Sequence, residues 1–292
     1  MSEEGSLGRF WREFAANRLA LAGLAVVVAI GLLALVAPWI APQNPYDLAQ
    51  LDIMDGRLPP GSASAEGLTY WLGTDDQGRD MLSGIIYGLR ISLIVGVGSA
   101  LIAGVIGSAL GLVAAYFGGR LEAAIMRLVD LQLAFPAILV ALMILAVLGK
   151  GVVNVMLAIV LVEWARYART ARGAALVERR REYMEAAQCL ALPRWRLLFV
   201  HLAPNCLPPL IVIGTIQIAR AITLEATLSF LGLGVPITEP SLGLLIANGY
   251  QYMLSGKYWI SFYPGIALLL TIVAINLVGD HLRDVLNPRL QR

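Results

Sequence analysis

Charged side chains are scarce in this sequence. Asp, Glu, Lys and Arg make up 14% of the 292 residues, whereas hydrophobic residues make up 58%. About a quarter of the residues in a soluble domain are charged, and a soluble protein this apolar would expose large apolar patches and aggregate. A lipid bilayer tolerates apolar side chains, so the composition predicts a membrane protein.

Cysteine and histidine are equally scarce, with two of each. Cys189 and Cys206 form no CxxC pair and lie near no histidine cluster, which argues against a disulfide framework or a zinc site. His201 and His281 have no second ligand three or four residues away. The motifs GxSxG, HExxH, GxGxxG and GxxxxGK(S/T) are also missing, so we expect a non-catalytic chain that itself binds no nucleotide, metal or other cofactor.

Six apolar stretches approach the length of a membrane-spanning helix, which is about 20 residues. Helices are expected because every backbone polar group in the hydrocarbon core needs a partner within its own segment. The first stretch exceeds the apolar core of a secretory signal, and Pro42 follows its one plausible cleavage site, so we interpret it as an uncleaved span. The predicted spans are Leu19–Ile40, Ile91–Ala115, Ala124–Leu148, Val152–Trp164, Leu207–Leu231 and Trp259–Val278.

Arginine and lysine gather on one side of these spans, which predicts that both termini are cytoplasmic. The largest basic group lies in the loop 166–205, and residues 282–292 form a cytoplasmic tail. Residues 1–18 are expected to form an interfacial helix, since Phe10, Trp11 and Phe14 recur at helical spacing with Leu7. The chain therefore divides into that helix, a first span at 19–40, a periplasmic loop at 41–90, a five-helix core at 91–281 and the tail.

Small residues recur at every fourth position of the second span, in the series Ala100, Gly104, Ser108 and Ala103, Gly107, Gly111. This spacing lets helix backbones approach closely, and we interpret it as tight packing inside the bundle.

The basic loop contains a short segment suited to docking on another protein. Its composition predicts a helix over Glu182–Leu190, and Pro193 then imposes a turn before a second short helix at Trp195–Leu202. Glu185 beside the small Ala186 and Ala187 makes a surface of low relief that seats in a protein groove.

This segment resembles the EAA loop of ABC importer permeases, and the whole chain is similar to the C-type permease subunit of the dipeptide, oligopeptide and nickel importer family. The blocks that carry the resemblance are Trp71–Asp80 with Ser83, Tyr87–Gly88 and Arg90–Leu93, then Glu225–Gly234, Gly279–Asp280, Leu282–Asp284 and Asn287–Leu290. The resemblance implies an all-α, six-helix, type I ABC importer permease fold in the cell inner membrane. It further implies a second homologous permease subunit, two ATPase subunits that bind ATP and Mg, and a periplasmic or lipid-anchored substrate-binding protein, with no nucleic acid.

The resemblance also implies which residues face the ATPase: Glu182, Glu185, Ala186, Ala187, Ala191 and Leu192. Ala191 stands where the family has glycine, which puts a left-handed turn there in doubt. Ala203 and Asn287 also depart from the family pattern, as does the outside loop after Gly234, which weakens an assignment of substrate.

Three charged residues within the spans are candidates for the pathway or its gate. Charges there are costly and by default mark a pathway or a buried pair. Arg220 and Glu225 are five residues apart and so lie on different helix faces; Glu225 suggests a structural or gating pair, and contact between Arg220 and a substrate carboxylate is a hypothesis. Asp130, near Pro136, either serves the pathway or bonds to a neighbouring helix end.

The acidic and basic residues Asp75, Asp76, Arg79 and Asp80 of the outside loop have two interpretations. They form either a solvated turn or a structural feature at the face for the second permease or the binding protein.

An ion-gradient-driven secondary transporter is the alternative from another class. It predicts inverted repeats and carboxylates at the midplane, whereas we find no convincing repeat and interpret Glu225 as the lone midplane carboxylate. Dipeptide, oligopeptide, nickel chelate, glutathione-like and opine-like solutes all stay open as substrates.

Overall fold

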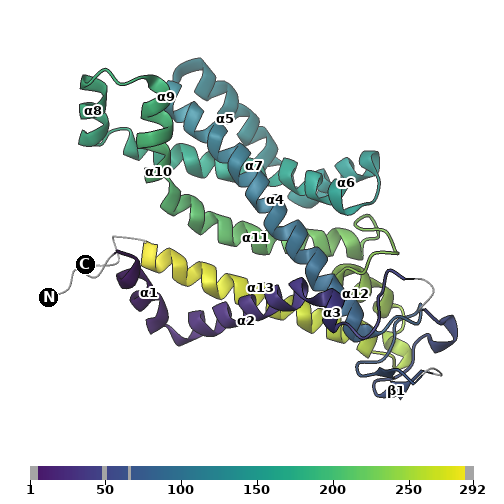
Figure 1. The fold of residues 1–292 in the computed structure, drawn as a ribbon. Helices are drawn as coiled ribbons and strands as arrows, with labels where there is room; N and C mark the ends of the chain where they lie inside the picture. The colour runs from purple at the N-terminus through teal and green to yellow at the C-terminus, as the bar shows by residue number, and fades with distance from the viewer. Residues whose placement is uncertain (1–5, 48–50, 65–66, 287–292) are drawn as a thin grey trace.

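The computed structural model describes residues 6–47, 51–64 and 67–286, and these residues are mostly helical. Figure 1 shows an elongated bundle with the short helix α8 at one end and the hairpin β1–β2 at the other. The long helices are α2 (Arg18–Leu35), α4 (Met81–Phe117), α5 (Gly119–Ala134), α6 (Ala137–Leu148), α7 (Val152–Glu178), α11 (Leu207–Phe230) and α13 (Trp259–Leu286). The short elements are α1 (Ser6–Ala16), α3 (Ala37–Ile40), η2 (Ile53–Asp55), β1 (Ser62–Ala63), β2 (Thr69–Tyr70), α8 (Glu182–Cys189), α9 (Arg194–Arg196), the π-helical η3 (Leu197–Leu202), α10 (Ala203–Asn205), α12 (Leu242–Tyr250) and η4 (Met253–Ser255).

Within the described residues, four helices are long and apolar enough to cross a membrane: α2, α4, α11 and α13. The expected span Ala124–Leu148 is not one continuous helix, because α5 and α6 meet at an angle of 93°. Pro136 has no N–H and forces the preceding Phe135 into an extended conformation, which ends α5. If the bent pair is one broken span the number rises to five; the six-span count and the orientation in the membrane stay predictions.

Two expected boundaries move. Helix α4 begins at Met81 rather than Ile91, because the Asp80 side chain accepts hydrogen bonds from the Ser83 N–H (2.8 Å) and hydroxyl (2.6 Å) and caps the helix. Helix α7 continues to Glu178, so the first part of the expected loop 166–205 is helical. Arginines in this part of α7 form ion pairs with carboxylates on α5. One example is the 2.5 Å pair between Arg172 and Glu122.

The packing expected of the small-residue stripe is confirmed. Helices α4 and α7 run side by side, and a Cβ placed on Gly107 or Gly111 would collide with the backbone of α7 at Trp164 or Ala168. The same surfaces bury Ala103 and Ala171 completely. Glycine here sets the distance between α4 and α7.

The segment between α11 and α13, expected to be an outside loop, contains helix α12. This helix buries Leu242 and Leu245 and packs against α4, α11 and α13. At the other end of the bundle, Phe14 of α1 packs on the His281 ring of α13 at 5.1 Å, so α1 and the end of α13 lie together at the α8 end (Figure 1). The motif Asn287–Leu290 lies outside the described residues.

Candidate functional site

The docking candidates lie on helix α8, which projects from the end of the bundle (Figure 1). Met184 and Ala187 are buried, whereas Glu182, Glu185 and Ala186 are exposed. One face of the helix is therefore packed on the chain and the opposite face carries the two carboxylates and a small side chain. Of the other two candidates, Ala191 is exposed and Leu192 is half-buried.

The turn after α8 is left-handed although alanine occupies it. Ala191 has φ +51°, so the doubt raised by the missing glycine is resolved in favour of the turn. The Ala191 N–H donates to the Gln188 carbonyl (2.9 Å) and the Leu192 N–H donates to the Ala187 carbonyl (3.4 Å). This pair of bonds is the Schellman helix ending, which normally uses glycine because a side chain is strained there.

Helix α8 rests on a buried apolar cluster that joins four parts of the chain. The cluster contains Leu112, Ala115, Ala171, Ala175, Met184, Ala187, Leu197, Leu198, Leu202, Cys206 and Leu210. The Arg179 guanidinium donates to the Ala115 carbonyl at the end of α4 (2.9 Å), a contact that the sequence did not reveal. The Tyr183 hydroxyl donates to Glu178 (3.1 Å), and partial burial together with this bond raises the pKa of Tyr183 to about 12.

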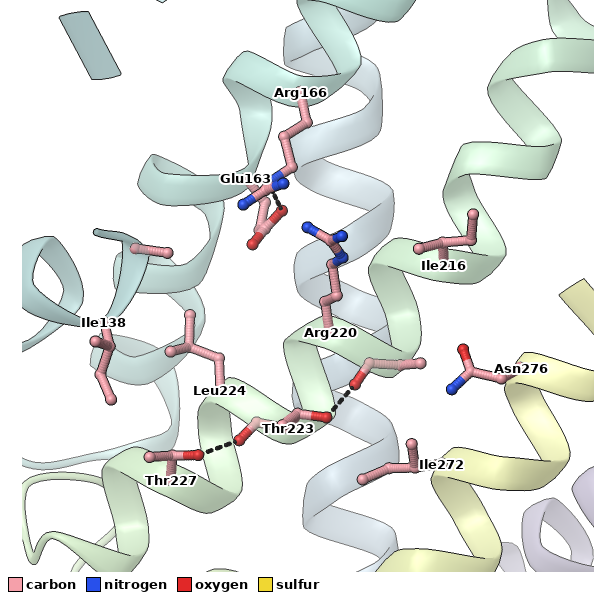
Figure 2. Close-up of a pocket in the computed structure, with 12 residues that line it drawn as sticks. Ile138, Glu163, Arg166, Ile216, Arg220, Thr223, Leu224, Thr227, Ile272 and Asn276 are labelled. Carbon is pink, nitrogen blue, oxygen red and sulfur yellow. Dashed lines mark hydrogen bonds and ion pairs between the residues drawn. The ribbon is translucent and has the colours of Figure 1, made fainter. Parts of the chain in front are cut away.

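A cavity of about 620 Å³ lies among α6, α7, α11 and α13 (Figure 2). Its polar lining contains Glu163 and Arg166 of α7, Arg220 of α11 and Asn276 of α13. Glu163 is buried, accepts a hydrogen bond from Gln217, and lies 3.2 Å from the Arg166 Nε. Sequence reasoning missed Glu163 and Gln217; the position of Glu163 near the end of the fourth predicted span was the available signal.

Arg220 and Glu225 lie on different faces of α11, as predicted from their spacing. Arg220 is exposed in this chain and its guanidinium points into the cavity toward Glu163 and Arg166 (Figure 2). Glu225 is fully buried on the other side, where it accepts hydrogen bonds from the hydroxyls of Ser229 (2.8 Å) and Ser92 (3.1 Å). The carboxyl group thus ties α11 to α4 through neutral donors, which the sequence did not reveal.

Asp130 forms an ion pair with Arg169 of α7, with 2.5 Å between the carboxylate and the guanidinium. Both side chains are more than half exposed. Asp130 therefore bonds to a side chain within a neighbouring helix, whereas one of its two interpretations had placed the bond at a helix end.

The hairpin end of the chain consists of residues 41–47, 51–64 and 67–80 together with α12. Most of the charged side chains that the sequence analysis singled out in this region are buried. Asp75 and Arg79 form a 2.7 Å ion pair with side-chain exposures of 1% and 2%, and Arg79 Nη1 also donates to the Ile237 carbonyl (3.1 Å) beyond α11. Asp80 is buried at the start of α4, and its N–H donates to the Gln43 side chain (2.6 Å). These residues form a structured junction, in contrast to the solvated turn that was one interpretation of them.

Burial also acts on the acids of this junction. It raises the pKa of Asp80 above its ordinary value, an effect that the hydrogen bonds from Ser83 oppose. It likewise raises the pKa of Asp76, helped by the neighbouring Asp75 carboxylate. Within the part of the chain that the structure describes, no group of three His, Cys, Asp or Glu side chains is arranged to hold a metal ion.

Comparison with known proteins accounts for nearly the whole chain. The family model for the binding-protein-dependent transport system inner membrane component matches residues 107–292, and the model for the N-terminal TM domain of oligopeptide transport permease C matches residues 6–60. The chain belongs to this family of inner-membrane transport components. Its location is accordingly the inner membrane, as the apolar helices require.

Members of the family with curated names resemble the chain along its length. The di/tripeptide transport system permease protein of Pseudomonas aeruginosa is 40% identical over 98% of this chain and 93% of its own length. The dipeptide transport system permease protein of Haemophilus influenzae is 38% identical over 98% and 96% of the two chains. The probable D,D-dipeptide transport system permease protein of Escherichia coli K12 is 39% identical over 93% and 88%.

The family fold is also recognisable in a solved structure. A chain of the MetNI methionine ABC transporter, in an inward-facing conformation, superposes with a TM-score of 0.59 over 71% of this chain and 98% of its own length. The sequences are only 18% identical, so this likeness speaks for the fold alone.

Proposed function

We propose that this chain forms one half of the transmembrane pathway of an ABC importer for peptides or similar small solutes. The observation that carries the proposal is the near full-length similarity, at about 40% identity, to permease proteins named for di- and tripeptide transport. A second homologous permease completes the pathway, two ATPase subunits supply the energy, and a binding protein delivers the substrate. The α8 end and both termini face the cytoplasm in this proposal.

The exposed face of α8 is proposed as the ATPase docking surface. Glu182 and Glu185 offer charge, and the small Ala186 leaves room for a groove to close around the helix. The buried face supports this role, because Met184 and Ala187 belong to the same apolar cluster as residues of α4 and α7. A push on α8 is therefore passed to the long helices instead of being absorbed by a loose loop.

In this proposal, transport depends on coupling between α8 and the long helices. Closure of the ATPase dimer moves α8, and the attached helices rock between inward- and outward-open states. The cavity around Arg220 adjoins a second one of about 450 Å³ that shares Arg166 and Arg220 and also reaches Arg169. A third, of about 750 Å³, shares Thr170 and Ile213 with the second and extends to Asn205 and Arg283. We propose this series as the wall of the exit route to the cytoplasm.

The test is peptide uptake by the complete importer in proteoliposomes. Glu185→Lys is expected to abolish ATP-driven uptake, because a reversed charge on the docking face opposes seating of the ATPase. Asp284→Lys, the same reversal at an exposed position near the end of α13, is expected to retain it.

Two results would contradict the proposal. One is that the Glu185→Lys importer takes up peptide at the same rate as the wild type. The other is peptide uptake by vesicles without the ATPase subunits when an ion gradient is imposed, which would favour a secondary transporter.

A further inference from the structure

Arg220 forms no ion pair with a carboxylate of the described residues, although it and the Glu163 carboxylate attract each other across the cavity. It lies near the middle of α11, a 24-residue helix. Of the cavity's three ionisable lining residues, Glu163 and Arg166 are paired with each other. Within residues 6–47, 51–64 and 67–286 no carboxylate lies within ion-pair distance of the Arg220 guanidinium, and Figure 2 shows that guanidinium directed into the hollow.

The electrostatics of the cavity favour an anion. Two guanidinium groups and one carboxylate give the lining a formal charge of +1. An arginine at the centre of a spanning helix is costly to insert, so such residues face a wet cavity or a partner and mark substrate pathways. Arg166 and Arg220 approach the same space from two helices, and their like charges add to the positive potential there.

We propose that Arg220 binds the C-terminal carboxylate of the peptide as it crosses the membrane. This inference rests on the proposed function and gives that pathway a specific ligand group. Every peptide with a free end carries this carboxylate whatever its side chains are, so a single guanidinium serves a pathway that accepts many sequences. A guanidinium also presents parallel N–H donors that match both oxygens of a carboxylate.

The neighbouring residues make the site selective for that end of the peptide. The Glu163 carboxylate already receives Gln217 and Arg166 and is buried, so this cavity offers no free acid to the peptide's ammonium group. Arg166 and Arg169 line the adjoining cavity toward the α8 end, and each has an acidic neighbour, Glu163 or Asp130. Their partly neutralised charges hold a carboxylate less firmly than Arg220, which lets the peptide leave toward the cytoplasm.

The experiment compares alanylalanine with its C-terminal amide, which lacks the negative charge. Binding of each to the complete importer in nanodiscs, without binding protein or nucleotide, is measured by saturation-transfer NMR. The wild-type importer is expected to bind the acid about tenfold more tightly, since hydrogen bonds from a guanidinium to a charged carboxylate are stronger than those to a neutral amide. Arg220→Gln is expected to bring the ratio to about one, and Arg220→Lys to restore part of it.

Arg127→Gln is the matched control, because it removes an exposed arginine of α5 that is not among the residues lining the cavity. It should leave the ratio at its wild-type value. An equal affinity for acid and amide in the wild-type importer, or no binding of either, would overturn the inference. So would an Arg220→Gln importer that loses its second permease subunit on purification, because Arg220 would then pair with a carboxylate of that subunit.

Failure of the proposed function has a separate signature. If the wild-type importer takes up no alanylalanine in the presence of ATP and binding protein, the proposed peptide transport is itself contradicted. Uptake by the wild type with an unchanged acid-to-amide ratio in Arg220→Gln would leave that function standing and remove only the role of Arg220.

Discussion

The two ends of the bundle treat charge in opposite ways. At the hairpin end, Asp75 and Arg79 are almost inaccessible and form an ion pair with each other, and the Glu225 carboxyl group accepts hydrogen bonds from two serine hydroxyls. Toward the α8 end, several charges are exposed, as in Glu182 and Glu185 of α8, and Arg220 has no ion-pair partner within the described residues. The hairpin end thus relies on buried contacts within the chain, whereas the α8 end presents exposed charged groups to which the proposed function assigns partners.

The largest loss of stability is expected when one member of the buried Asp75–Arg79 ion pair is removed. Asp75→Ala leaves the Arg79 guanidinium buried without its counter-ion and is expected to cost about 3–5 kcal/mol of stability. Asp130→Ala is the matched variant, since it deletes a carboxylate from the exposed pair with Arg169, which contributes at most about 1 kcal/mol. Both are measured as the midpoint of thermal unfolding of the purified complex. Equal losses in the two variants would show that burial does not separate the two ends.

Replacing Glu225 is expected to cause a smaller loss of stability. Glu225→Ala removes the acceptor of the Ser92 and Ser229 hydroxyls and opens a cavity beside α4, and a loss of about 2–4 kcal/mol is expected. Glu225→Gln keeps the shape and one acceptor oxygen, so its loss should be clearly smaller. The unfolding midpoints of the two variants test this order, and a glutamine variant as unstable as the alanine variant would point to a need for the negative charge.

Several features of the fold and of the candidate site could be predicted from local sequence. The helix at Glu182, the glycine stripe of α4 and the different faces of Arg220 and Glu225 follow from spacing over a few residues. The bend at Pro136 was also readable, since proline restricts the residue before it, but the continuous apolar run masked it.

The parts that escaped prediction depend on residues distant in sequence. Glu163 meets Gln217, and Arg79 meets Ile237, only after the chain has folded, so one sequence without relatives cannot pair them. Asp80 was interpreted as a loop acid because its role as the cap of α4 depends on where that helix begins. The conformation of Ala191 is likewise set by the turn between α8 and the apolar cluster beneath it, which overrides the preference of alanine.

The turn at Ala191 gives the smallest expected effect, and it tests whether the α8 end carries local strain. A left-handed conformation costs a residue with a side chain about 1–2 kcal/mol, so Ala191→Gly is expected to stabilise the protein by about 0.5 kcal/mol after the added freedom of the unfolded chain is counted. Ala186→Gly, the same substitution within helix α8, should destabilise it by about 0.5–1 kcal/mol. Unfolding midpoints that shift in the same direction for both variants would contradict a strained turn, whereas opposite shifts would place the strain at Ala191 itself.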